Sequence, residues 1–208
     1  MSIDLKSAVP VGVPVRLAIG PHGEMEGASG RYEKRWGELD GIYRDTAAFD
    51  AIVRERGRAT VAYHVSEHRY SSQPGALIVG TSTVLPGVVG AEFAMTRGHL
   101  HGISDRAELY HCLSGHGVML LDSVDGQSVA IELRPGQAVN VPGDWVHRSV
   151  NVGTEPFVTL FCYNADAGQD YGIIADAGGM KTLVVGSGSG WEQVPNPDHR
   201  GYASGRAR

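Results

Sequence analysis

The part of the sequence that decides the fold is His99-Leu100-His101, followed seven residues later by Glu108-Leu109-Tyr110. Side chains alternate between the two faces of a strand, so His99 and His101 point to one side and Leu100 to the other. Glu108 opens a second β-rich run and shares its face with Tyr110. His147, which opens a third run, can complete a chelating set of three imidazoles and one carboxylate.

Such a set suits a borderline divalent cation such as Fe, Mn, Ni, Co or Zn. Four protein ligands leave an octahedral metal two open positions, which can take the oxygens of a substrate. The sequence therefore predicts one divalent metal ion held by His99, His101, Glu108 and His147, with iron favoured. The other six histidines are interpreted as ordinary surface or core residues: His22, His64, His68, His111, His116 and His199.

Short β-rich runs separated by turn residues surround these positions. Pairs such as Pro86-Gly87, Asp125-Gly126 and Pro135-Gly136 supply the backbone conformations that turns need. Many short strands without interleaved helices predict an all-β sandwich or closed barrel. The expected strands are 59–65, 76–85, 91–96, 108–114, 117–121, 128–133, 138–141, 147–151, 156–163 and 182–185.

The two ends of the chain differ from this middle part. Residues 1–44 are rich in Gly and Pro and show weak periodicity, and a helix follows from Asp45 or Thr46 to a stop at Gly57. Residues 186–190 form a Ser/Gly hinge, and we expect partial disorder or a subunit contact at 199–208, which is small, polar and basic. The predicted organisation is an N-terminal extension at 1–58, packed on the barrel or on a partner, a barrel at 59–186 and a flexible tail at 187–208.

Composition limits the classes of function. With 208 residues, a net charge of −5 and a pI near 6.0, the chain has no general attraction for nucleic acid. The segment Met1–Pro10 lacks the apolar stretch of a signal peptide, and no run approaches the ~18–20 apolar residues of a membrane span. Two cysteines do not make a disulfide framework. We expect a cytoplasmic protein that acts on a small molecule.

Two motifs resemble those of the cupin superfamily. The first is His99-x-His101-x6-Glu108-x6-Gly115, and the second is Gly136-x5-Pro142-x4-His147-x3-Asn151. The gap between His101 and Glu108 is longer than in the general pattern, and Asp144 stands where the second motif usually has glycine. The resemblance implies a cupin double-stranded β-helix, a jelly-roll barrel.

The long gap is typical of a narrower group, the cupin-type glucose-6-phosphate isomerases. The stretches that resemble them are 95–101, 106–110, 144–151 and 165–172. The resemblance implies a homodimer that interconverts D-glucose 6-phosphate and D-fructose 6-phosphate at a bound metal, in glycolysis and gluconeogenesis. It also implies that Thr83, Thr96, Gly98 and Tyr163 lie around the sugar phosphate and that Tyr110 and Tyr171 line the pocket, with Tyr63 as a weaker candidate. Gln169 departs from the family, which commonly has histidine there.

Aldose–ketose isomerisation needs a group that polarises the carbonyl and a group that moves a proton. The metal meets the first need, and Glu108 is the base that we expect within reach. Tyr110, on the same face as Glu108, is expected to donate a hydrogen bond to the sugar. A carboxylate bound to a dication is a weakened base, so transfer through an enediol and a direct hydride shift both stay open.

Other interpretations also stay open at this point. Tyr110 is equally a cross-strand packing aromatic, Tyr163 can end an inward-facing row, and Thr83 and Thr96 are common strand residues. The barrel could instead serve an iron-dependent oxygenase or a cupin that binds metal or sugar without turnover. A third alternative is another isomerase substrate, such as mannose 6-phosphate or an unphosphorylated pentose.

Overall fold

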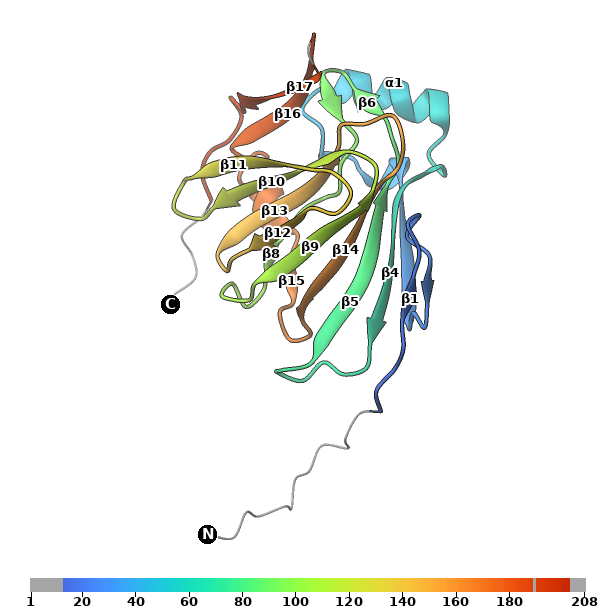
Figure 1. Cartoon of the computed structure of the whole chain (residues 1–208). Coiled ribbons are helices and arrows are strands. Elements are labelled where there is room, and N and C mark those ends of the chain that lie inside the picture. Colours follow the sequence, from blue (N-terminus) through green and yellow to red (C-terminus); the bar gives the residue numbers. More distant parts are fainter. Residues whose placement is uncertain (1–12, 189, 203–208) are drawn as a thin grey trace.

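The computed structural model describes residues 13–188 and 190–202, and most of the ordered elements are strands (Figure 1). The all-β prediction is confirmed. The expected helix is also confirmed: α1 (Thr46–Arg56) begins after Asp45, whose side chain accepts a hydrogen bond from the Ala48 amide, and it ends at Gly57. Two shorter helices, η1 (Trp36–Glu38) and α2 (Gly172–Asp176), were not predicted.

The first sheet forms one wall of the barrel, and its antiparallel strands lie side by side in Figure 1. Its residue pairs form rows that cross several strands. In one row, Arg69, Ile78, Tyr163 and Glu108 are consecutive partners. In order across the sheet, the strands are β12 (Ala138–Val141), β9 (Glu108–Ser114), β14 (Phe157–Asn164), β5 (Leu77–Val84), β4 (Val61–Arg69) and β3 (Gly30–Arg35).

The second sheet contains β11 (Ser128–Leu133), β10 (Gly117–Ser123) and β13 (Trp145–Asn151). Isolated bridges join β13 to the segment 95–99, which leads into β8 (Leu100–His101), and β8 pairs with β15 (Gln169–Asp170). Every residue of β10 is buried, because this sheet is covered on both faces. One face looks into the barrel, and the other packs under the C-terminal part of the chain.

A third sheet closes one end of the barrel. It contains β17 (Gly190–Pro195), β16 (Thr182–Ser187), β7 (Glu92–Phe93) and β6 (Val88–Val89), and a separate hairpin pairs β1 (Ala18–Ile19) with β2 (Met25–Glu26). The strand expected at 91–96 is therefore much shorter, since the chain leaves β7 to run along β13. Among the described residues, none of the helices is long and apolar enough to cross a membrane.

The expected division into 1–58, 59–186 and 187–208 stays a prediction. Within the first part, β3 pairs with β4 and extends the main sheet, and within the last part β17 pairs with β16. Residues 1–12, 189 and 203–208, on which part of these expectations falls, lie outside the described residues.

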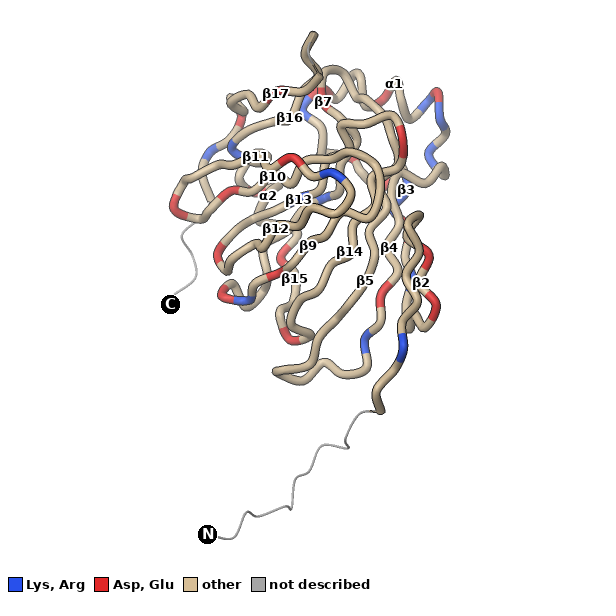
Figure 2. Tube along the Cα trace, viewed as in Figure 1, with Lys and Arg blue, Asp and Glu red and all other residues tan. Residues whose placement is uncertain are grey.

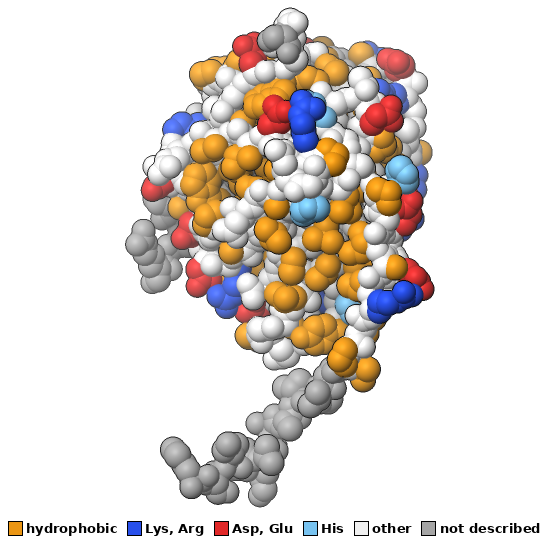
Figure 3. All heavy atoms as spheres, viewed as in Figure 1, with side chains coloured by type: hydrophobic (Ala, Val, Ile, Leu, Met, Phe, Trp, Pro, Cys, Tyr) orange, Lys and Arg blue, Asp and Glu red, His pale blue; other side chains and the backbone are white. Residues whose placement is uncertain are grey.

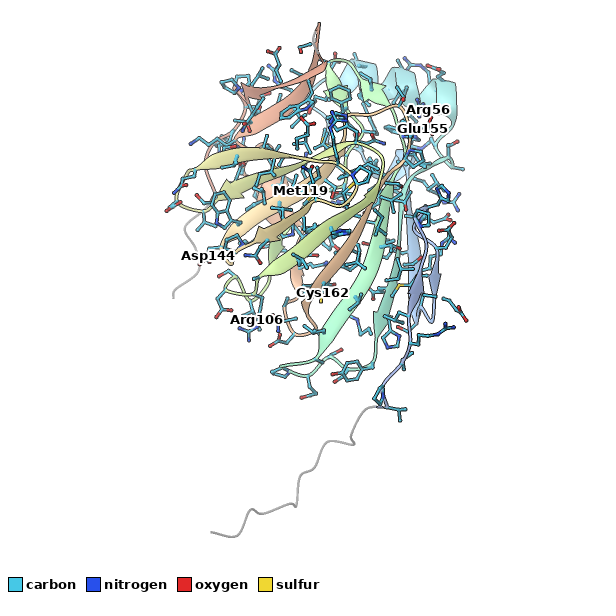
Figure 4. All side chains as sticks on the ribbon, in the orientation of Figure 1. Arg56, Arg106, Met119, Asp144, Glu155 and Cys162 are labelled. Carbon is cyan, nitrogen blue, oxygen red and sulfur yellow. The ribbon has the colours of Figure 1, made fainter. Side chains whose placement is uncertain are left out.

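The departure at Asp144 from the usual cupin motif has a clear structural basis. Asp144 lies in the turn between β12 and β13 and has a φ of 63° (Figure 4). This left-handed conformation is the reason that glycine suits the position, and aspartate tolerates it better than most residues. The turn delivers the chain into β13, which carries His147.

Candidate active site

Three histidines and one glutamate converge inside the barrel. The Oε2 atom of Glu108 lies 3.1 Å from Nε2 of His101, 3.0 Å from Nε2 of His147 and 3.9 Å from Nε2 of His99. One ligand atom of each residue lies within 4.8 Å of those of the other three. The structure thus brings together all four predicted ligands, from β8 and its preceding residue, β9 and β13.

The orientation of the rings fits a cation. The Nδ1 atoms of His101 and His147 lie 2.7 Å from the Arg106 carbonyl and 2.9 Å from the Trp145 carbonyl. A carbonyl only accepts, so each Nδ1 donates. Each Nε2 then presents a lone pair toward Glu108 when the imidazole is neutral, and donates a hydrogen bond to Glu108 when the imidazole is protonated. The Nε2 atom of His99 is buried without a hydrogen-bond partner. Lone pairs that converge on a carboxylate need a positive charge between them.

The electrostatics of the cluster agree with this geometry. Burial lowers the pKa of His99 to about 3, so this imidazole is neutral at ordinary pH. Burial alone would raise the pKa of Glu108, but hydrogen bonds from His101 and His147 hold it well below its usual range. Burial opposes a charge on His101 as well, yet its hydrogen bond with Glu108 raises the pKa of this imidazole. The buried cluster is consistent with a metal site.

A cavity of about 200 Å³ opens beside this cluster. It is lined by six of the predicted substrate and catalytic residues, and also by Tyr63 and Gln169. Those six residues are Thr96, Gly98, Glu108, Tyr110, Tyr163 and Tyr171. The Tyr163 ring also contacts the cluster, because it stacks on His101.

Thr83 is the exception, and the structure does not bring it to the cavity. It pairs with Val158 and points to the outer face of the sheet, where it faces Gly23. Ser82, one residue earlier, lines the cavity. Successive residues of a strand face opposite sides, so a one-residue error in alignment exchanges the faces. The run Thr81-Ser82-Thr83 has a hydroxyl at every position, and the sequence could not choose among them.

Several residues of the cavity were not predicted. Glu67 and Arg69 lie on the same face of β4 as Tyr63, and alternation along that strand could have found them. Tyr32 comes from the N-terminal part of the chain, where periodicity gave no signal. The remaining cavity residues that were not predicted are Val65, Arg97, Ser149 and Phe161.

The cavity contains two arginines with different surroundings. Arg69 lies 3.4 Å from Glu67, so its charge is partly compensated. The guanidinium of Arg97 lies 5.9 Å from the centre of the Tyr171 ring, and it makes no ion pair with the carboxylates of the described residues. Arg97 therefore leaves an uncompensated positive charge at the cavity.

Comparison with known proteins identifies the family. The sequence profile of the family described as "Glucose-6-phosphate isomerase (GPI)" matches residues 33–200. The chain belongs to the glucose-6-phosphate isomerase family. It is 49% identical over 179 residues to a glucose-6-phosphate isomerase of Sinorhizobium medicae, covering 86% of this chain and 83% of that protein. It is 39% identical to a glucose-6-phosphate isomerase of Pyrococcus furiosus, covering 90% of this chain and 96% of that protein.

The matched region of this glucose-6-phosphate isomerase family member includes all four cluster residues. Over about half of its length the chain is also similar to a solved structure of oxalate oxidase, with a TM-score of 0.43 and 19% identity, covering 52% of this chain and 54% of that chain.

Proposed function

We propose that the chain interconverts D-glucose 6-phosphate and D-fructose 6-phosphate, a reaction of glycolysis and gluconeogenesis, with the help of one divalent cation. The observation that carries the proposal is the convergence of three imidazole nitrogens and one carboxylate oxygen beside a polar cavity, in a member of this family. Sugar phosphates are cytoplasmic metabolites, so the proposal includes a cytoplasmic location.

His99, His101, Glu108 and His147 would hold the cation, and iron is the favoured ion, with Mn, Ni, Co or Zn as alternatives. Imidazole nitrogens suit these borderline ions better than they suit Mg or Ca. When bound, such an ion supplies a Lewis acid that stabilises charge on the oxygens of the substrate.

The row of residues across the first sheet indicates how the substrate lies. The main chains of Arg69 and Glu108 are separated by three strand spacings of about 4.8 Å each, or about 14 Å in total. This distance accommodates a hexose phosphate with its carbonyl end at Glu108. Ser82, Thr96, Gly98 and Tyr163 would surround the phosphate, with Ser82 in the role first expected for Thr83. Arg97 adds a positive charge near it.

Glu108 and Tyr110 are the proposed catalytic residues. Burial and the charge of Glu108 raise the pKa of Tyr110 well above its usual value, so its hydroxyl stays protonated and donates to the carboxylate. Tyr110 would therefore orient Glu108, which would move a proton between C1 and C2 of the substrate.

A coupled assay with fructose 6-phosphate tests the proposal. The purified protein is stripped with a chelator and then given single cations. We expect activity to fall at least 100-fold on stripping, an effect of several kcal/mol typical of lost metal catalysis, and to return with the native ion. Full activity after verified removal of metal would contradict the mechanism.

Deuterated water distinguishes the two proton-transfer routes. Deuterium that appears at C2 of glucose 6-phosphate supports an enediol and a role for Glu108 as base. Its complete absence at every stage of conversion would indicate a hydride shift and remove Glu108 from that role.

The family resemblance also leads us to propose a homodimer, formed through the outer face of the first sheet. Leu109, Cys162 and Val79 are consecutive partners across β9, β14 and β5, and they face away from the barrel. These three strands carry no Lys, Arg or Asp, and the only Glu is buried Glu108 (Figure 2). Hydrophobic side chains gather over the same face in Figure 3. A second copy of the chain would cover this surface.

A further inference from the structure

An extra residue interrupts the pairing between β13 and the segment that leads to the cluster. Met95 is bridged to Val150, and His99 is bridged to His147. Between these two bridges the segment has three residues, 96–98, whereas β13 has only two, 148 and 149. The segment therefore contains a β-bulge, a feature that redirects side chains and occurs often beside active sites.

The bulge is centred on Arg97 and Gly98. Gly98 has a φ of 72°, and a Cβ atom there would lie 2.8 Å from the His147 carbonyl oxygen and 2.9 Å from Cβ of Arg148. Only glycine fits such a close approach in this conformation. On one side of the bulge Arg97 lines the cavity, and on the other side His99 enters the metal cluster.

A side chain satisfies the main-chain carbonyl of Arg97, which accepts a hydrogen bond of 2.8 Å from Nη2 of Arg148. Ser149 likewise donates its N–H to the Thr96 side chain instead of to a main-chain carbonyl. The geometry of the bulge thus depends on these side chains.

Arg148 is an unusual residue to find in this place. It is only 4% exposed, and it makes no ion pair with a carboxylate anywhere in residues 13–188 and 190–202. Its Nη1 lies 2.8 Å from Sδ of Met95, and its Nε has no partner. Glu92 and Asp122 are close enough to act on its charge. Burying a guanidinium without a paired carboxylate costs free energy, so a compensating role is expected.

We infer that Arg148 is a positioning residue. It fixes the Arg97–Gly98 bulge and thereby places Arg97 at the cavity and His99 among the four proposed metal ligands. The inference rests on the proposed function, because it takes the anion at Arg97 to be the phosphate of the substrate. Arg148 touches neither the phosphate nor the cation. It acts through the carbonyl of the residue that does meet the phosphate.

The planar guanidinium explains why arginine is needed. Its two terminal nitrogens reach two acceptors at once, the carbonyl of Arg97 and the sulfur of Met95. Lysine keeps the positive charge near Glu92 and Asp122 but presents one flexible ammonium group. The variant Arg148→Lys therefore preserves the charge in the buried region while it releases the bulge.

The first test measures binding without turnover. The metal-free wild type and the metal-free Arg148→Lys variant are titrated with inorganic phosphate to measure the affinity for phosphate. In a separate titration with Mn²⁺, electron paramagnetic resonance measures the affinity for the metal. We expect Arg148→Lys to weaken both by roughly tenfold, which corresponds to about 1.4 kcal/mol, while the melting temperature falls by only a few degrees. The matched control is Arg134→Lys, the same change at an exposed arginine, and it should alter neither affinity. A lower melting temperature with both affinities unchanged would show a merely structural role and overturn the inference.

A double-mutant cycle tests the route through Arg97. Arg97→Gln should weaken phosphate binding, and Arg148→Lys should add little further loss in that background, because the side chain being positioned is gone. Equal losses in both backgrounds would overturn the inference. Should Arg148→Lys fail to fold, Met95→Leu removes the second acceptor and should weaken phosphate binding about twofold to threefold, an effect below 1 kcal/mol. Unchanged binding in that variant would count against the inference.

The two proposals can fail separately. If wild type binds phosphate and Mn²⁺ as expected but does not isomerise fructose 6-phosphate, the proposed function fails while the role of Arg148 stands. If isomerisation is confirmed and Arg148→Lys raises neither dissociation constant nor the KM, only the positioning role fails.

Discussion

The ring of Tyr163 stacks on the imidazole of His101, with centroids 5.4 Å apart and planes inclined by 29°. Tyr163 is also the partner of Glu108 across β14 and β9. One aromatic side chain therefore contacts a histidine of the buried cluster and also lines the cavity beside it.

Two substitutions of Tyr163 should separate these contacts. Tyr163→Phe keeps the ring and removes the hydroxyl, so we expect the KM for fructose 6-phosphate to rise about tenfold, as for a lost hydrogen bond to a charged group, with metal affinity unchanged. Tyr163→Leu also removes the stacked ring and should weaken metal binding. Steady-state kinetics and metal titration measure the two effects. Equal metal affinities in the two variants would contradict the supporting role of the ring.

Ser82 and Thr83 offer a matched pair on opposite faces of β5. Ser82→Ala removes a hydroxyl from the cavity and should raise the KM about threefold to tenfold, the loss of one hydrogen bond. Thr83→Val should leave kinetics unchanged, because its side chain faces Gly23. The buried Oγ1 of Thr83 has no hydrogen-bond partner, so its replacement by a methyl group should be neutral or stabilising. A large kinetic effect of Thr83→Val would contradict this assignment and support the contact between Thr83 and the sugar phosphate that the family resemblance implied.

Metal binding should release protons in a pH-dependent manner. Burial disfavours charge on His101, but its hydrogen bond with Glu108 raises the pKa of His101 overall, so part of the metal-free protein carries this proton near neutral pH. A cation must displace it. Titration calorimetry in buffers of different ionisation enthalpy should detect release near neutral pH and less release well above the raised pKa. Release that grows with pH would contradict this assignment.

The same proton affects the stability of the metal-free protein. Because the pKa of His101 is higher in the folded chain than in the unfolded chain, the bound proton stabilises the fold. This contribution is complete below the unfolded pKa of about 6.5 and is lost as the pH rises through the folded value. Denaturant titrations of the metal-free protein at several pH values measure this loss.

A glutamate on the apolar outer face should dissociate the proposed homodimer. Leu77, on β5, is 47% exposed, and Val129, on β11 of the other sheet, is 39% exposed. We expect Leu77→Glu to shift the sedimentation coefficient to that of a monomer, while Val129→Glu leaves the assembly intact. If wild type sediments as a monomer, or if both variants remain dimeric, the proposed interface is wrong.

Sequence reasoning predicted much of the barrel because its signals were local. The strands 108–114, 128–133 and 138–141 agree with β9, β11 and β12 to the residue, since turn residues bound them on both sides. The four ligands could be predicted because strand alternation and the family motifs select the same residues. The strand β3 was missed because its pattern, Gly30 to Arg35, is polar and follows a Gly-rich segment.

The remainder of the site depended on register and on long-range packing. The choice between Ser82 and Thr83 depends on which side of β5 faces inward, which three consecutive hydroxyl residues do not reveal. The role inferred for Arg148 depends on a bulge, and a bulge is a difference in residue count between two segments about 50 positions apart in the chain. No local pattern encodes that count.

The short ladder between β8 and β15 allows the rim of the cavity to open without disturbing the residues that would hold the metal ion. Only two residue pairs join these strands, and β15 leads directly to Tyr171 at the rim of the cavity, whereas His147 lies within seven continuous pairs between β13 and β10. The rim at 169–171 can therefore detach at a small cost in main-chain hydrogen bonds while the floor of the site stays intact. A product could leave in this way many times during the residence of a single ion.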